Sequence, residues 1–251
     1  MAVRLAVFGD MHVPYHDPVA VEIFLKTMQA FKPDIIVCLG DVMDCIQFSS
    51  YIEPYGMPVN QYEQDIQIAR DLLERVRQQC SKLVFLEGNH EYRIDRWAGS
   101  TKEGQRLYKM IAPRHVLKDV GIDVYIPYLT LKQRYPYYRI NSRLIAVHGW
   151  TYAKHATKNH LTLSQGKSVI HGHTHNADVA MIQGLWASNS VVEARSAGCL
   201  CRRIPLYNTG RPVEWVHAFI IGYLGRRSDT LYTIPIYQNR CILPDGKEIH
   251  V

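Results

Sequence analysis

The chain has 251 residues, of which 47% are apolar and 21% charged, the balance of an ordinary globular protein that can bury a sizeable core. No apolar run is long enough for a membrane-spanning helix, and the net charge of +6 is only moderately basic. The first residues, "MAVRLAVFGDMH", do not resemble a signal peptide, and the six cysteines follow no disulfide-framework spacing. We therefore expect a cytoplasmic protein with free thiols and no membrane association.

The first half of the chain alternates apolar runs with amphipathic segments. The apolar runs predict three buried strands, at 2–8, 35–40 and 82–88. Helical spacing of apolar residues predicts helices over about 18–31 and from Ile66 to Cys80. This alternation favours parallel strands joined by right-handed crossovers, with the carboxyl ends of the strands along one binding crevice.

The second half has more strand patterns and few helical ones. Strands are expected at 143–149, 168–173, 178–183, 190–195, 216–224 and 230–237, with one short helix at 152–163. No internal repeat or linker is evident in the sequence, so we expect a single domain over residues 1–251 that contains two sheets. The segment after about residue 202 carries no motif, and we expect it to complete the second sheet.

Polar residues that can bind metal ions follow the predicted strands. In chain order the motifs are "DMH" (10–12), "GDVMD" (40–44), "GNHE" (88–91), "HG" (148–149) and "GHTH" (172–175). Carboxylate, imidazole and amide donors without cysteine suit Mn²⁺, Fe²⁺ or Zn²⁺. The candidate ligands are too many for one tetrahedral ion but suit two ions that share a carboxylate: Asp10, His12, Asp41, Asn89, His148, His173 and His175. Two adjacent ions stabilise both the attacking and the leaving oxygen of a phosphoryl displacement, so the pattern predicts a binuclear hydrolase of phosphate esters.

This ordered set of motifs resembles that of the calcineurin-like metallophosphoesterase superfamily and spans most of the chain. The resemblance implies a mixed α/β fold, a four-layer αββα sandwich of two mixed β-sheets flanked by helices. The whole pattern is also similar to a group of small, cap-less phosphoesterases common in bacteriophages and prophages.

The resemblance also implies a role for each motif residue. Asp10, His12 and His175 would hold one ion, and Asn89, His148 and His173 the other, with Asp41 bridging the two. His90 would donate a proton to the leaving oxygen, and Asp44 would orient His90. A hydroxide that bridges the ions would attack the phosphorus. We expect manganese, with iron, zinc or nickel as alternatives.

Other residues near the motifs have weaker patterns. His155 follows the "HG" motif and Arg93 follows the "GNHE" motif, so either could contact the substrate, with an exposed helical position as the alternative for Arg93. We expect His160 on the surface of a helix. Cys199 and Cys201 resemble half of a zinc ribbon, but the sequence has no second pair, so we expect them to be buried strand residues without a metal.

A stretch without acidic residues surrounds the last two motifs. No Asp or Glu occurs from Val124 to Ala177, where basic and aromatic residues alternate instead: Lys132, Arg134, Arg139, Arg143, Lys154, Lys158, Lys167, Tyr125, Tyr128, Tyr135, Tyr137, Tyr138, Trp150 and Tyr152. Such a mixture suits a polyanion with bases that can stack, such as nucleotides or nucleic acid. The alternative is a solvated surface with tyrosines at its rim.

Three functions stay open. The first is a phosphodiesterase that acts on nucleotide or nucleic-acid substrates. The second is a phosphomonoesterase for small monoesters or phosphoproteins, but protein phosphatases of the superfamily usually continue the second motif with Arg-Gly, where this chain has Cys45 and Ile46. The third is a non-catalytic metal-binding scaffold, which the presence of His90 disfavours. The sequence leaves the oligomeric state open.

Overall fold

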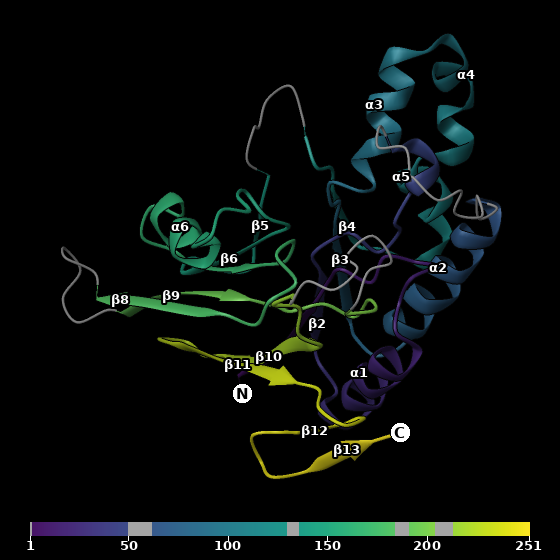
Figure 1. Ribbon diagram of the computed structural model, residues 1–251. Helices are drawn as coiled ribbons and strands as arrows, with labels where there is room; N and C mark the ends of the chain where they lie inside the picture. The colour runs from purple at the N-terminus through teal and green to yellow at the C-terminus, as the bar shows by residue number, and fades with distance from the viewer. Residues whose placement is uncertain (1, 50–61, 130–135, 184–190, 204–212) are drawn as a thin grey trace.

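The computed structural model describes residues 2–49, 62–129, 136–183, 191–203 and 213–251, and two β-sheets with helices on their outer faces make up most of it (Figure 1). The first sheet has the order β11 (Asp229–Pro235), β10 (Ala218–Leu224), β1 (Val3–Phe8), β2 (Ile35–Cys38), β3 (Lys82–Leu86) and β4 (Val124–Ile126). Strands β1 to β4 are parallel, as the alternation of strands and helices predicted. Their carboxyl ends therefore lie along one edge of this sheet.

The second sheet is mixed as well. Its order is β5 (Tyr138–Arg139), β6 (Leu144–Val147), β7 (Ser168–His171), β9 (Val191–Ser196) and β8 (Val179–Gln183). Strands β6, β7 and β9 are parallel to one another, and β5 and β8 are antiparallel at the two edges. The two motifs "HG" and "GHTH" directly follow the neighbouring strands β6 and β7.

The carboxyl-terminal strands contradict one expectation. Strands β10 and β11 lie after residue 202, but they extend the first sheet and not the second, with β10 antiparallel to β1 and Val3 opposite Leu224. An apolar strand pattern indicates which face is buried, whereas the choice of sheet depends on long-range packing that a local pattern does not encode. The last strands, β12 (Arg240–Ile242) and β13 (Glu248–His250), form a separate hairpin.

Helices cover the outer faces of both sheets. The structure contains α1 (Pro18–Phe31), α2 (Tyr62–Arg77), α3 (Tyr92–Ser100), α4 (Lys102–Ile111), α5 (Pro113–Val116) and α6 (Ala156–Leu163), with 3₁₀ turns η1 (Ile46–Phe48) and η2 (Lys118–Val120). Helix α1 begins as predicted because the Asp17 carboxylate accepts hydrogen bonds from the backbone N–H groups of Val19 and Ala20. The pair α3–α4 and strand β4 were not predicted, because their apolar patterns are short.

Three apolar clusters hold these layers together. One lies between α1, α2 and the first sheet and includes Phe24, Met28, Leu73, Phe8 and Phe85. A second lies between the sheets and includes Val7, Val37, Ala146 and Ile170. A third joins Leu161 of α6 to Val147 and Val169 of the second sheet. The order helix, sheet, sheet, helix confirms the predicted four-layer mixed α/β sandwich, while the single domain over residues 1–251 stays a prediction.

The described helices also bear on membrane association. Within the described ranges, no helix combines the length and the apolar character that a bilayer crossing requires.

Candidate metal centre

The loops that follow β1, β2, β3, β6 and β7 meet at the strand ends, and they bring the predicted ligands together. Each of the first six residues in the following list lies within 3.8 Å of the next one: Asp10, His175, His12, Asp41, His148 and Asn89. The seventh, His173, forms a compact group with Asp41 and His148. His12 and His175, which are in contact, lie 163 positions apart in the chain. The sequence prediction that the motifs converge in space is therefore confirmed by the geometry, while the roles of the individual residues stay predictions.

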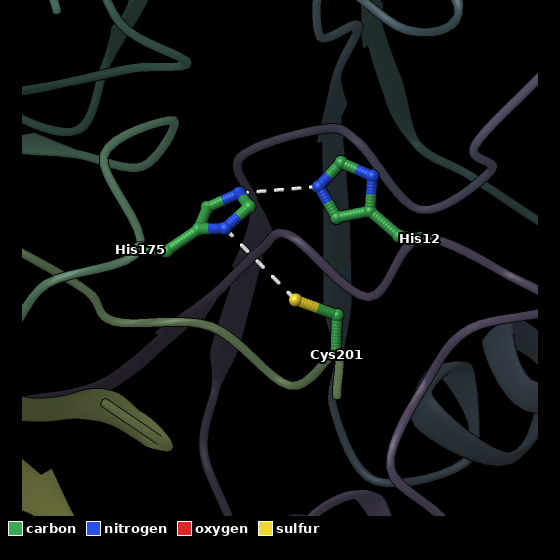
Figure 2. A group of neighbouring side chains, drawn as sticks. All are labelled: His12, His175 and Cys201. Atoms are coloured by element: carbon green, nitrogen blue, oxygen red, sulfur yellow. Dashed lines mark hydrogen bonds between the residues drawn. The ribbon is translucent and has the colours of Figure 1, made fainter. Parts of the chain in front are cut away.

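The first group contains two buried histidines and a buried carboxylate. His12 Nε2 lies 3.1 Å from His175 Nε2 (Figure 2). The same His175 nitrogen lies 3.2 Å from Asp10 Oδ1. Ligand atoms about 2.1 Å from a common zinc ion are roughly 3–3.5 Å apart, so these separations fit one cation. Burial alone would lower the pKa of His175, but the neighbouring Asp10 carboxylate raises it to about 9.

The second group brings an imidazole nitrogen and an amide oxygen together. His148 Nδ1 donates to the carbonyl oxygen of Leu39 at 2.8 Å, which leaves Nε2 to face the site. That nitrogen lies 2.9 Å from Asn89 Oδ1. Both atoms can bind a borderline divalent cation. A nitrogen of His148, a nitrogen of His173 and an oxygen of Asp41 lie within 4.8 Å of one another, which completes the group.

Asp41 lies between the two groups. Its Oδ1 accepts a hydrogen bond from the His90 backbone N–H at 2.9 Å, while its Oδ2 lies 3.4 Å from His148 Nε2 and 3.8 Å from His12 Nε2. Burial would raise the pKa of this carboxyl, but the surrounding histidines, His148 foremost, hold it below its usual range. Asp41 is therefore the carboxylate whose position suits a ligand shared by two ions.

His90 is held beside this cluster by Asp44. His90 Nδ1 lies 3.0 Å from the backbone oxygen of Asp44 and 3.3 Å from its Oδ2. The same carboxylate oxygen lies 3.1 Å from Nδ1 of His12, so Asp44 orients two histidines and not only the predicted one. These two contacts hold the pKa of Asp44 far below its usual range despite burial. Burial would lower the pKa of His90, but the Asp41 and Asp44 carboxylates raise it.

Arg93 belongs to the site and does not lie on the outer surface of α3. Its guanidinium donates to the backbone oxygen of Asp44 at 2.8 Å, and Nη2 lies 3.2 Å from His90 Nε2. His155 is exposed at the amino-terminal end of α6, and among the described residues it makes no hydrogen bond or ion pair with the clustered ligands. The substrate contacts of both residues stay predictions.

The backbone at the centre is unusual. Five of the predicted ligands have positive φ angles between 49° and 69°: Asp10, His12, Asp41, His173 and His175. Such residues cost about 1–3 kcal/mol each and tend to cluster at functional sites. The neighbouring glycines are required by close packing, because a Cβ atom at Gly172 would lie 2.6 Å from Asp10 Oδ2 and one at Gly88 would collide with the Asp41 carboxylate.

Glu91 has a structural role that the sequence analysis did not assign. Its buried carboxylate accepts hydrogen bonds of 2.9 Å from the backbone N–H groups of Asp41, Met43 and Gly88. It thereby ties the loop after β2 to the loop after β3. Burial, with a contribution from Asp41, raises the pKa of Glu91 to about 8. The sequence contained this residue as the last letter of the "GNHE" motif, but the motif alone does not indicate what the carboxylate binds.

Cys201 also lies at the site. The cysteine is buried as expected, but its Sγ lies 4.0 Å from His175 Nδ1, and a nitrogen of His12, a nitrogen of His175 and this sulfur are within 4.8 Å of one another (Figure 2). Cys199 and Cys201 occupy isolated bridges, with His217 and His16, and not regular strands. The expectation that both cysteines lie in regular strands is therefore wrong, while the ligand set without cysteine stays a prediction.

His160 is a second correction. It is fully buried, accepts a hydrogen bond from the Trp150 backbone N–H at 2.8 Å and stacks on His171 with ring centroids 4.1 Å apart. Its position on the helix surface was expected from the polar character of histidine, but the ring is satisfied by these contacts and by the carbonyl oxygen of Ala156.

Comparisons with known proteins agree with this architecture. Vps29 of Cryptosporidium parvum is 11% identical with a TM-score of 0.52, and the match covers 100% of this chain and 99% of that chain. Vps29 of Entamoeba histolytica in complex with Zn²⁺ is 12% identical with a TM-score of 0.51, covering 99% and 98%. The E. coli phosphoesterase YfcE is 15% identical with a TM-score of 0.42, covering 98% and 97%. At these identities the two Vps29 structures show a shared fold alone, and no curated protein matches the chain in sequence.

The sequence itself carries the assignment. The family model for calcineurin-like phosphoesterases matches residues 3–177, which is more than half of the chain and includes each of the five motifs. The chain belongs to the calcineurin-like phosphoesterase family.

Proposed function

We propose that this protein is a phosphodiesterase that uses two divalent cations. The observation that carries the proposal is the pair of ligand groups on either side of one Asp41 oxygen, 3.4 Å from His148 and 3.8 Å from His12. Each group combines a carboxylate or amide oxygen with imidazole nitrogens, a donor set that suits borderline divalent ions. Manganese is our first choice, with iron, zinc or nickel as alternatives.

Bound cations would supply positive charge for both reacting oxygens of the phosphate and lower the pKa of water. The protein then has to supply a proton to the leaving oxygen. His90 suits this role because Asp44 fixes its Nδ1 and because two carboxylates raise its pKa, which favours the protonated ring. Arg93 Nη2 lies 3.2 Å from His90 Nε2, so the guanidinium has to turn away when the protonated ring donates from that nitrogen, and a phosphate oxygen is a suitable acceptor for it.

The loop after β2 supports a diester over a phosphoprotein. At the positions where protein phosphatases of the superfamily carry Arg-Gly, the structure has buried Cys45 in the left-handed conformation and Ile46 at the start of η1. Neither side chain can bind a phosphate. A small monoester is the alternative substrate that this geometry still allows.

Some residues of the basic and aromatic stretch support a nucleotide or nucleic-acid substrate, and others do not. Tyr128 and Tyr152 lie within 6.0 Å of His148 and His173, respectively, measured between ring centroids. Arg143, in contrast, forms a bidentate ion pair with Asp229 and is engaged in the fold. Lys132, Arg134 and Tyr135 lie outside the described residues. A cytoplasmic location stays part of the proposal.

The test compares a diester with a monoester. The metal-free protein is loaded with Mn²⁺, and turnover of bis(p-nitrophenyl) phosphate and p-nitrophenyl phosphate is measured at equal concentration. We expect Mn²⁺-dependent turnover with a preference for the diester. A large preference for the monoester would contradict the diesterase, and bound metal without turnover of either compound would favour a scaffold.

A further inference from the structure

A cavity of about 260 Å³ opens next to the candidate metal centre. It lies between the ends of β3 and β4 and the loop after β6, and its lining includes Glu87, Ile126, Pro127, Tyr128, His148 and Trp150. His148 belongs both to this lining and to the second ligand group, so the cavity and the metal centre share a wall. The volume is below the roughly 300–1,000 Å³ of sites for drug-sized ligands and suits a single small ring system.

Aromatic and aliphatic residues form part of the cavity wall. Tyr128 and Trp150 supply aromatic rings, and Ile126 and Pro127 supply aliphatic surface. The Tyr128 ring is fixed from two sides, since its centroid lies 5.3 Å from that of Tyr92 and 5.9 Å from that of His148. A fixed aromatic wall favours a flat, stackable group over a flexible chain.

One buried carboxylate also lines the cavity. Glu87 Oε1 accepts a hydrogen bond from the Tyr125 hydroxyl at 2.5 Å, and Oε2 accepts one from the Tyr128 backbone N–H at 2.9 Å. The nearest arginine, Arg114, lies 3.6 Å from Oε1. The Glu87 side chain is only 1% exposed, so these contacts fix it within the wall of the cavity.

We propose that the cavity binds the nucleobase of a nucleotide-containing phosphate ester while the phosphate lies at the adjacent metal centre. The base stacks on the aromatic wall. This inference rests on the proposed function, because it places the phosphate at the metal centre. It narrows the substrate class from phosphate esters in general to those with a base beside the phosphate.

The test compares two ligands that share a phosphate. Binding of AMP and of ribose 5-phosphate to the Mn²⁺-loaded protein is measured by calorimetry. Stacking of the base on an aromatic ring strengthens binding, so we expect AMP to bind roughly ten times more tightly. Tyr128→Leu should abolish the difference, and Leu129→Trp, which adds bulk to another lining residue, should do the same without removing Tyr128. Tyr237→Leu, at an exposed tyrosine outside the lining, should preserve it.

Adenosine separates this inference from the proposed function. Because adenosine has no phosphate, its binding to the metal-free protein reports on the cavity alone. Adenosine binding that is lost in Tyr128→Leu would support the cavity even if bis(p-nitrophenyl) phosphate is not hydrolysed. Equal affinity for AMP and ribose 5-phosphate, or an AMP preference that survives both lining variants, would overturn the inference.

Discussion

The Nε2 atoms of His12 and His175 lie 3.1 Å apart, although 163 positions separate the two residues in the chain. His12 is oriented by Asp44 through its Nδ1, and His175 faces Cys201 through its own Nδ1. Each ring is thus held from behind, so that its other nitrogen points at the shared position. Histidines that bind metal ions have this arrangement, with a partner on the nitrogen that does not bind the ion.

Metal binding should therefore stabilise the protein through these histidines. At a cation concentration about 100 times the dissociation constant, binding to the folded state alone adds about 2.7 kcal/mol to the free energy of unfolding. We expect Mn²⁺ or Zn²⁺ to raise the Tm of the metal-free protein by several degrees, and His175→Ala to lose much of this increase. The control is His250→Ala, at an exposed position in β13. An unchanged increase in His175→Ala would exclude His175 as a ligand.

Asp41→Asn should weaken both ions. The substitution removes the negative charge that both histidine groups face and replaces one carboxylate oxygen by an amide nitrogen, which cannot bind a cation. Metal content after dialysis, measured by inductively coupled plasma mass spectrometry, should fall for both ions together. Full retention of one ion would show that Asp41 belongs to a single site.

His90→Ala should affect turnover more than metal content. Loss of a general acid costs about 10²–10⁴ in rate. A nitrogen of His90 lies within 4.8 Å of ligand atoms of His12 and Asp41, so the alternative role of a metal ligand is geometrically open. Parallel assays of bis(p-nitrophenyl) phosphate turnover and bound metal distinguish the roles, since a ligand would lose both together.

Glu91→Gln should lower the free energy of unfolding, although Glu91 is given no role in substrate binding. The new amide group has only one oxygen, so at least one of the three backbone N–H groups that now donate to Glu91 would face an NH₂ group. An unpaired buried donor costs about 1–3 kcal/mol. Urea denaturation of the metal-free protein should show this decrease relative to the wild type. The matched substitution Glu74→Gln, at an exposed position of α2, should leave the midpoint nearly unchanged.

The buried ring of His160 should make stability depend on pH. Burial lowers the pKa of His160 to about 4, whereas the unfolded chain has the ordinary value near 6.5, so the unfolded state binds a proton first as the pH falls. The stabilisation is complete above pH 6.5 and is lost as the pH falls toward 4, with a total on the order of 3 kcal/mol. Denaturation of the metal-free protein across this range should show the loss, and His160→Gln should reduce it. An equal loss in that variant would assign the effect to other groups, including His171.

The predicted strands and helices agree with the structure where a local apolar pattern is enough to identify the element. The strands near 2–8 and 82–88 and the helix at 18–31 appear as β1, β3 and α1 because their apolar periodicity was uninterrupted. The helix expected from Ile66 begins at Tyr62 and ends at Arg77 as α2. Helix ends depend on caps and packing, so their limits are less certain than their presence.

The sequence by itself determined the family and the candidate ligands, because both depend on which residues follow which strand. The tertiary structure decided which groups face one another: that Asp44 orients His12 as well as His90, that Glu91 joins two loops, and that Cys201 lies behind His175. It also decided that β10 joins the first sheet. These contacts connect residues that are far apart in the chain, and their energies depend on three-dimensional packing and burial, which short-range periodicity does not contain.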